Sequence, residues 1–255
     1  TEGAYDDAIR HAITKMSHLH FTSTEEYRKR VIQLGESPDR VFNVGAIGVE
    51  NIKKGSFLSK EELENSLGFK LGDKSLLVTF HPVTLETCTA REQCDNLLEV
   101  LARHPEYRII FTLPNSDTDG RVIIDCIKDF VAKNEDRAIA FKSLGKLRYL
   151  SALKYVSAAI GNSSSGILEV PSFGIPTLDI GNRQKGRIAA KSVVHCGTST
   201  EEIEQGFRLI FSETIQSASK LRSNPYEKEG TTDMIVSQLK TYPLENLIQK
   251  SFYNL

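Results

Sequence analysis

The chain has 255 residues, of which 40% are hydrophobic and 25% are charged, and its formal net charge at pH 7 is -1. This composition is ordinary for a soluble globular protein with one large domain or two modest ones, and it argues against a nucleic-acid-binding surface or a polybasic membrane anchor. The apolar runs fall far short of the roughly 18 residues that a membrane-spanning helix needs, so we expect neither nucleic acids nor membranes as partners.

The cysteine pattern favours reduced thiols in a cytoplasmic protein. The four cysteines have no C-x-x-C spacing: Cys88, Cys94, Cys126 and Cys196. Disulfides and metal ligation are therefore the weaker interpretations. His81 and His195 also lack a carboxylate or thiol at ligand spacing, so we expect no metal and no cofactor.

The first 52 residues predict two helices and two short strands. Apolar positions recur at helical spacing over residues 5–15, and a strand-like segment follows at residues 18–23. Thr24 has the position of an N-cap for a second helix that ends at Gly35. Residues 40–45 predict the second short strand.

A polar span over residues 53–74 predicts a linker that contains one short helix, residues 60–66. We therefore place the domain boundary in this span. Residues 1–52 then belong to one domain, and residues 75–255 form a second domain that includes the C-terminal helices.

Beyond the linker, short apolar runs alternate with amphipathic segments. The runs predict strands at residues 75–80, 107–113, 138–141, 158–160, 177–180 and 192–195. The segments between and after them predict helices at residues 94–103, 121–132, 147–156, 201–211 and 231–239. This alternation is typical of a parallel sheet with helices on both faces, which is a doubly wound α/β domain.

Ligands of an open parallel sheet bind beyond the carboxyl ends of its strands, in the turns that lead to the helices. We therefore list the polar residues that follow the strands: His81-Pro82, residues 114–117, residues 142–145, residues 161–166 and residues 181–184. All these turns are expected at one edge of the sheet.

The turn Gly161-Asn-Ser-Ser-Ser-Gly166 is the most informative of them. Its serines stand where a helix begins, which suits either a simple N-terminal cap or a phosphate site, and for the serines alone the cap is the stronger interpretation. Glu169, one turn later, and Arg183, after the next strand, favour a ligand instead. A diphosphate needs donors and a cation, and a pair of sugar hydroxyls needs a carboxylate acceptor.

The other polar groups have ordinary explanations. Taken alone, His81 also fits a half-buried structural histidine, and Asn115 fits a common turn residue. The cations Lys185, Arg187 and Lys191 fit a solvated surface. The pair Asp6-Asp7, with Arg10 one turn later, is explained by the helix dipole and an ion pair, although a proton-shuttling role is also possible chemistry.

Five ordered motifs together resemble a known family. They are Asp6-Asp7-x-Ile-Arg10-His-Ala-Ile-Thr-Lys15, Thr79-Phe-His-Pro82, Pro114-Asn115, Gly161-Asn-Ser-Ser-x-Gly166 with Glu169, and Gly181-x-Arg-Gln184. The sequence closely resembles the UDP-N-acetylglucosamine 2-epimerase family, specifically its hydrolysing branch, which makes N-acetylmannosamine for sialic acid synthesis.

The resemblance implies a GT-B-like architecture of two Rossmann-type domains, and a homo-oligomer. Family members carry a whole N-terminal domain ahead of the Asp-Asp helix. This chain is therefore expected to comprise the tail of that first domain and the complete second domain. We expect such a chain to bind UDP and to have little or no turnover.

The resemblance also implies roles for individual residues in binding UDP and the UDP-N-acetylhexosamine. His81 would donate to the diphosphate, Ser163 and Ser164 would hold phosphate oxygens, and Glu169 would accept from the ribose hydroxyls. The remaining implied contacts are Asn115 and Arg183 in the nucleotide-sugar pocket, and Phe141, Lys142 and Leu144 in the turn near the uracil.

The family reaction removes the proton at C2 of the sugar while UDP leaves C1, and water then adds to the resulting 2-acetamidoglucal. By resemblance, Asp6 and Asp7 are among the acidic catalytic residues and Arg10 lies beside them. Alternatives are a hydrolysing 2-epimerase of a UDP-linked 2,4-diacetamido-trideoxyhexose and a non-catalytic nucleotide-sugar-binding module. A GT-B glycosyltransferase fits the Asp-Asp helix less well.

Overall fold

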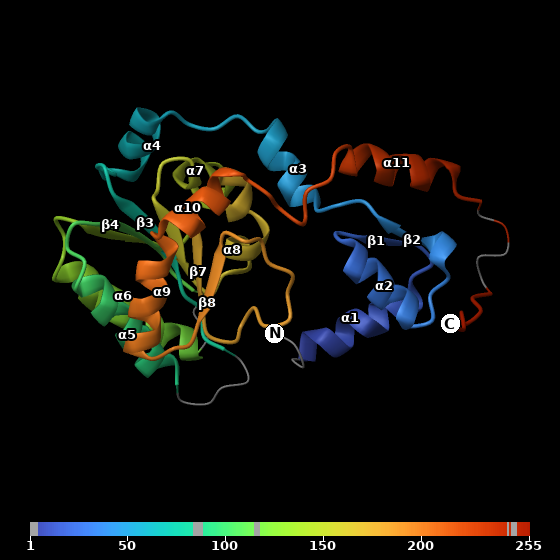
Figure 1. The fold of residues 1–255 in the computed structure, drawn as a ribbon, viewed down its shortest axis with the longest axis horizontal. Coiled ribbons are helices and arrows are strands. Elements are labelled where there is room, and N and C mark those ends of the chain that lie inside the picture. The colour runs from blue at the N-terminus through green and yellow to red at the C-terminus, as the bar shows by residue number, and fades with distance from the viewer. Residues whose placement is uncertain (1–4, 84–88, 115–117, 244, 246–248) are drawn as a thin grey trace. The chain divides into compact units, whose positions relative to one another are not determined.

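The computed structural model describes residues 5–83, 89–114, 118–243, 245 and 249–255. The chain divides into two compact units (Figure 1). Ser56–Asn224 form the larger unit. The described residues up to Gly55, together with Pro225–Leu255, form the smaller unit. Within the described part of the chain, every helix is too short or too polar to cross a membrane.

The larger unit contains a six-stranded parallel sheet with the strand order β5-β4-β3-β6-β7-β8. The strands are β3 (Ser75–Thr79), β4 (Arg108–Thr112), β5 (Ala138–Phe141), β6 (Ala158–Gly161), β7 (Thr177–Ile180) and β8 (Val193–Cys196). The predicted doubly wound sheet is confirmed, and each predicted strand overlaps an observed one. If the six strands are numbered 1 to 6 in chain order, this order is 3-2-1-4-5-6, which is typical of a dinucleotide-binding fold. Successive strands are added toward one edge of the sheet up to β5 and toward the other edge from β6 onward, so the order reverses between β3 and β6.

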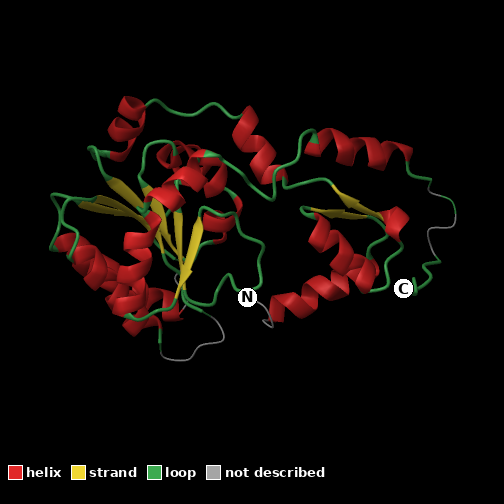
Figure 2. Ribbon diagram, in the orientation of Figure 1, coloured by secondary structure: helices red, strands yellow, loops and turns green. Residues whose placement is uncertain are grey.

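Helices cover both faces of this sheet (Figure 2). They are α4 (Lys60–Leu67), α5 (Ala90–Ala102), α6 (Thr118–Ala132), α7 (Gly145–Leu153), α8 (Ser164–Leu168), α9 (Thr200–Ile210) and α10 (Glu213–Lys220), and the 3-10 helix η2 (Val170–Phe173) follows α8. Helix α5 packs between α6 and α9, while α4 packs against α7. All five residues of β3 are buried. Burial on two faces explains why the strands are continuous apolar runs.

The span that the sequence predicts as a linker belongs to the larger unit from Ser56 onward. Leu63 of α4 is completely buried, and the Phe57 ring makes an edge contact with Phe173 at 5.7 Å between ring centres. The Tyr155 hydroxyl donates to the Leu58 carbonyl at 3.0 Å. Exposed polar residues such as Glu61 and Asn65 give this span its polar character, but residues 56–74 group with the larger unit, whereas the sequence predicts a linker over residues 53–74.

The smaller unit is built from α1 (Tyr5–Met16), β1 (His20–Thr22), α2 (Glu25–Gln33), the 3-10 helix η1 (Pro38–Arg40), β2 (Val41–Asn43), α3 (Ile47–Lys54) and α11 (Thr231–Thr241). Strands β1 and β2 pair in parallel. Thr24 caps α2 as predicted, because its hydroxyl accepts from the Tyr27 N–H at 3.2 Å.

The C-terminal residues from Pro225 belong to the smaller unit, where they pack with the N-terminal segment. The Thr231 hydroxyl donates to the Val44 carbonyl at 2.6 Å, and the Thr232 N–H donates to the buried Glu50 carboxylate at 3.0 Å. The sequence analysis assigned these residues to the nucleotide-binding domain. The contacts of α11 differ from this assignment, because helical periodicity predicts α11 but not the unit against which it packs.

A buried carboxylate holds helix α1 in the smaller unit. Glu36 is fully buried and accepts hydrogen bonds from Lys15, His20 and Lys250, with N···O distances of 2.7, 2.9 and 2.6 Å. Burial raises the pKa of Glu36, but these three donors outweigh burial and bring the pKa down to about 2. Lys250 also donates to the Lys15 carbonyl at 2.9 Å, which satisfies an otherwise unpaired group at the end of α1.

Gly161 provides a test of how tightly β3 and β6 approach each other. Its φ is 132°, and an added Cβ would lie 1.9 Å from the Thr79 carbonyl oxygen. Gly161→Ala should therefore destabilise the protein by about 3 kcal/mol or more, measured by urea unfolding. Gly68→Ala is the matched control, because Gly68 has φ of 61° and nothing within 4 Å of the added Cβ. It should cost only about 1 kcal/mol, and equal losses would contradict the close approach.

Candidate functional site

The candidate site lies where the strand order reverses, between the carboxyl ends of β3 and β6. The connections that leave these two neighbouring strands run to opposite faces of the sheet, which opens a crevice at their ends. His81 follows β3, and Asn162 follows β6 directly. The predicted turn of residues 161–166, called the serine turn below, is therefore placed at the reversal point.

Asn162 joins the two strand ends through its side chain. Its Oδ1 accepts from the His81 N–H at 2.8 Å, and its Nδ2 donates to the His81 carbonyl at 2.8 Å. The Asn162 N–H also donates to the Thr79 carbonyl at 3.1 Å, and the residue is 1% exposed. An amide side chain can donate and accept at once, so it fixes the backbone of His81 in both directions.

Arg183 and Gln184 reach the same loop from the turn after β7. Arg183 Nη1 donates to the Asn162 carbonyl at 3.0 Å, and Gln184 Nε2 donates to that oxygen at 2.7 Å. The structure thus brings the predicted Arg183 to the serine turn. The sequence analysis assigned no role to Asn162 or Gln184, although both residues are in the quoted motifs.

Ser163 and Ser164 stand at the beginning of α8. Ser163 is the N-cap, and its hydroxyl accepts from the Ser165 N–H at 3.4 Å. The capping interpretation of Ser163 is therefore observed. Both Ser163 and Ser164 are half-buried, and Gly161 places no side chain beside them.

A cavity of about 400 Å³ lies beside this turn and collects several predicted residues. Its lining includes His81, Lys142, Leu144 and Glu169, together with Thr79, Thr112, Leu113, Ser143, Gly145, Lys146, Tyr149 and Leu150. Glu169 follows α8 directly and is half-buried. A carboxylate, a histidine, a lysine and a turn with accessible backbone thus meet at one edge of the sheet.

Some predicted residues are not part of this lining. Phe141 ends β5, and the Arg148 guanidinium lies 5.8 Å from its ring centre. Ser163 lines a small hollow that shares Thr79 and Tyr149 with the larger cavity. Asn115 lies outside the described residues.

Tyr149 lines the cavity of about 400 Å³, and the sequence analysis did not predict it as a site residue. Its hydroxyl donates to Ser165 Oγ at 2.8 Å, which connects α7 with the serine turn. Burial raises the pKa of Tyr149 to about 12, and the nearby Glu169 carboxylate acts in the same direction. The hydroxyl therefore remains a neutral donor at physiological pH. Only a contact between separate helices reveals this role, because the local sequence is that of an ordinary amphipathic helix.

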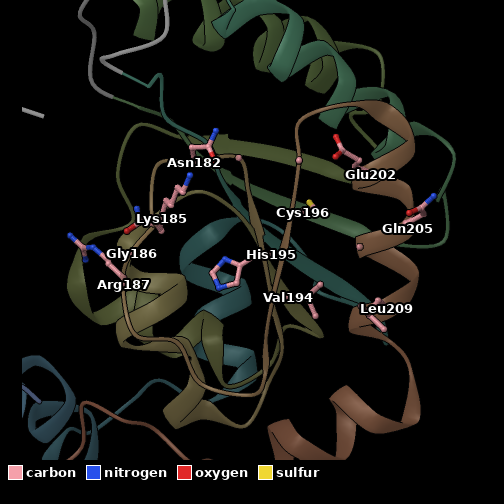
Figure 3. Close-up of a pocket in the computed structure, with 14 residues that line it drawn as sticks. Asn182, Lys185, Gly186, Arg187, Val194, His195, Cys196, Glu202, Gln205 and Leu209 are labelled. Carbon is pink, nitrogen blue, oxygen red and sulfur yellow. The ribbon is translucent and has the colours of Figure 1, made fainter. Parts of the chain in front are cut away.

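A second cavity of about 640 Å³ opens between residues 181–187, the end of β8 and helix α9 (Figure 3). At its centre His195 Nδ1 lies 2.8 Å from the carboxylate of Asp179. Its described lining residues do not include any that line the cavity of about 400 Å³. The sequence analysis predicted no ligand here and placed the nucleotide at the reversal point.

The predicted catalytic residues lie on α1, in the smaller unit, and are not part of the group that the larger unit assembles. The Asp7 carboxylate lies 3.9 Å from His11 Nε2, and the side chain of Asp7 is 41% exposed. Arg10 is exposed, and the side chain of Asp6 lies outside the described residues. Within the described part of the chain, no three His, Cys, Asp or Glu side chains gather as a metal site would need.

Asn162→Ala should test the connection between the strand ends. The change removes both side-chain hydrogen bonds to His81, so we expect a loss of about 1–3 kcal/mol in the free energy of unfolding. Asn182→Ala, at an exposed position in the next turn, is the control and should change stability by less than about 0.5 kcal/mol. Similar unfolding midpoints for the two variants would show that Asn162 does not brace the site.

Comparison with known proteins agrees with this architecture. The model of a family described as UDP-N-acetylglucosamine 2-epimerase matches residues 1–240. A GDP/UDP-N,N'-diacetylbacillosamine 2-epimerase (hydrolyzing) from Campylobacter jejuni is 39% identical over 256 residues, which cover 100% of this chain and 66% of the relative. The polysialic acid biosynthesis protein P7 of Escherichia coli is 40% identical over 253 residues, which cover 98% of this chain and 64% of the relative. The chain spans just under two thirds of the length of these relatives.

The fold is also that of a solved structure of this kind. A UDP-GlcNAc 2-epimerase from Neisseria meningitidis bound to UDP-GlcNAc superimposes with a TM-score of 0.73 at 19% identity, covering 89% of this chain and 62% of that one. The predicted GT-B-like α/β class is thereby confirmed. With a family model that extends over nearly all its residues, the chain belongs to the UDP-N-acetylglucosamine 2-epimerase family.

Proposed function

We propose that this chain is the nucleotide-binding part of a hydrolysing 2-epimerase, which converts a UDP-linked 2-acetamido sugar and water into UDP and the free C2-inverted sugar. The observation that carries the proposal is the group of polar residues at the reversal point between β3 and β6. His81, Arg183 and the serine turn meet there, and Glu169 lines the adjoining cavity.

The diphosphate is assigned to the serine turn. The hydroxyls of Ser163 and Ser164 stand at the beginning of α8, where the positive end of the helix dipole and the first backbone N–H groups favour an anion. Arg183 supplies positive charge from the turn after β7, and His81 supplies a ring donor after β3. Such donors hold phosphate oxygens and stabilise negative charge on a departing UDP.

The nucleoside is assigned to the cavity of about 400 Å³. The Glu169 carboxylate offers two oxygens to the vicinal ribose hydroxyls, and the buried Leu144 offers an apolar wall to the uracil. Lys142 and Phe141 flank the same turn. Asn115 follows β4 in sequence and is proposed for the same pocket.

The reaction requires an acid–base pair that acts on the sugar. A base takes the proton from C2, the electrons of the C–H bond form the C1=C2 double bond, and the C1–O bond breaks with its electrons on UDP. Water then adds across the double bond and restores a proton at C2 from the other face. We assign Asp6 and Asp7 to this proton transfer and Arg10 to their electrostatic support.

For the sugar we propose N-acetylglucosamine, with N-acetylmannosamine as the product for sialic acid synthesis; the polysialic acid name of the Escherichia coli relative supports this choice. The second candidate is a 2,4-diacetamido-trideoxyhexose, which the name of the Campylobacter relative favours. The two sugars differ at C4 and C6, far from the bonds that break, so one UDP site can serve either substrate.

Glu169→Gln and Ser164→Ala should each weaken UDP binding by about 10- to 100-fold, because each removes a contact worth about 1.5–3 kcal/mol. Isothermal titration calorimetry of the 255-residue chain with UDP measures the change. Glu201→Gln, an exposed carboxylate at the start of α9, is the matched control and should bind UDP as wild type does. Unchanged affinity in both site variants would refute the site assignment.

Turnover in D2O distinguishes the proposed reaction from its alternatives. A protein that contains this chain should release UDP together with a free sugar that carries deuterium at C2, observed by proton NMR with either nucleotide sugar. Retention of the sugar on UDP would indicate a non-hydrolysing epimerase. Asp7→Asn should abolish deuterium incorporation while UDP affinity stays unchanged; an Asp7→Asn variant that turns over as fast as wild type would exclude the assigned role.

A further inference from the structure

The proposed function assigns no ligand to the second cavity, which has a volume of about 640 Å³ and a lining that includes charged side chains. One wall is the turn of residues 181–187, the floor is the end of β8, and the other wall is one side of α9 from Glu202 to Leu209. Figure 3 shows the His195 imidazole at the centre, with Lys185 and Arg187 on the turn to one side and Glu202 and Gln205 on α9 to the other.

His195 is held in a defined orientation by a buried carboxylate. Asp179 and His195 are paired residues on the neighbouring strands β7 and β8. The Asp179 side chain is 2% exposed and that of His195 is 49% exposed. Because Nδ1 donates to the carboxylate at 2.8 Å, the other ring nitrogen, Nε2, remains for a ligand. The hydrogen bond from Asp179 raises the pKa of His195, and partial burial opposes that rise.

The turn beside His195 is rich in positive charge. Residues 181–187 contain Arg183, Lys185 and Arg187 and no acidic residue. In the described part of the chain, the side chains of Lys185 and Arg187 form no ion pair. Glu202 is the acid among the described lining residues, and its carboxylate already accepts from the Ser199 hydroxyl at 2.7 Å and from the Ser199 N–H at 3.3 Å.

Hydrogen bonds hold the backbone of this turn at its first residue, Gly181, and at Gln184 in its middle. The Gly181 N–H donates to the Cys196 carbonyl at 2.9 Å, which ties the turn to the end of β8. The buried Gln184 donates to the Asn162 carbonyl at 2.7 Å, and the Arg187 N–H donates back to the Gln184 carbonyl at 3.2 Å. A rigid backbone lowers the cost of ordering side chains around a ligand.

We propose that this cavity is a second ligand site, which binds the phosphate group of a small phosphorylated metabolite through His195 Nε2, Lys185 and Arg187. Flexible cations donate to phosphate oxygens, and so does the Nε2–H of protonated His195, whose charge the Asp179 carboxylate stabilises. A neutral ligand would leave the two cations unpaired. The cavity is larger than one phosphate needs. Val194 and Leu209 supply apolar surface for the rest of the molecule.

The test is an NMR titration that observes the imidazole of His195. The 255-residue chain with labelled histidines is titrated with inorganic phosphate, with glucose 6-phosphate and with glucose, and His195→Gln assigns the resonance. We expect both phosphates to shift His195 saturably and glucose to leave it unmoved. Tighter binding of glucose 6-phosphate identifies a phosphorylated sugar as the ligand class, and equal binding identifies the phosphate group alone.

Two double variants decide whether phosphate binds through the residues of this cavity or only through the overall positive charge of the protein. Lys185→Ala with Arg187→Ala should raise the dissociation constant by about tenfold or more, since two charge-assisted contacts are lost. Lys191→Ala with Lys220→Ala removes the same charge from exposed positions outside the cavity lining and should change it less than about twofold.

Three results would overturn the proposal: an unmoved His195 resonance, equal weakening in the two double variants, or displacement of phosphate by saturating UDP. The last result would place the anion in the nucleotide pocket. UDP affinity measured in the same samples tests the proposed function separately, because the described linings of the two cavities have no residue in common. A chain that fails to bind UDP and still shifts His195 with phosphate would refute only the proposed function.

Discussion

The connection between the carboxyl ends of β3 and β6 is the constraint on which the site depends. Two neighbouring parallel strands send their chains to opposite faces of the sheet at this point, so the loops that follow them would separate without a link. Asn162 supplies the link, because its amide both accepts from and donates to the backbone of His81. The backbone carbonyl of Asn162 accepts hydrogen bonds from the Arg183 and Gln184 side chains, which extends the link to the turn after β7.

Close packing at this point also dictates the residue types. The backbone of Gly161 lies so near the Thr79 carbonyl that a side chain has no room, and its φ of 132° suits glycine. The strands behind the loops are buried on both faces, which makes their ends rigid supports. Polar groups on such ends are pre-oriented, and a ligand does not have to order them.

The larger unit presents two chemically different cavities at the same edge of its sheet. The one beside β3, β4 and β5 combines the Glu169 carboxylate with an apolar turn, which suits a nucleoside. The one beside β7 and β8 combines cations with an imidazole that is supported by a buried aspartate, which suits an anion. Residues 181–187 contact the reversal point through Arg183 and Gln184, which donate to the Asn162 carbonyl, while Lys185 and Arg187 line the cavity beside β7 and β8.

Most of the larger unit and part of its site could be predicted from the sequence. Apolar runs that are buried on two faces are local signals, and so are the polar residues that follow them. His81, the serine turn, Glu169 and Arg183 were predicted as site residues in this way. Asn162, Gln184 and Tyr149 were missed as site residues, because their partners lie 16 to 81 residues away in the chain. The pairing of Asp179 with His195 depends likewise on the alignment of two strands.

The sequence by itself determined the order of strands and helices, the turns that carry polar chemistry and the resemblance to a family, since these depend on local pattern. Only the tertiary structure decided which unit each segment joins. Residues 53–74 look polar but bury Leu63 in the larger unit, and the C-terminal helix is tied to Val44 and Glu50 some 180 residues earlier. A periodic pattern shows that a helix has an apolar face, but the surface that covers this face is set by contacts between distant parts of the chain.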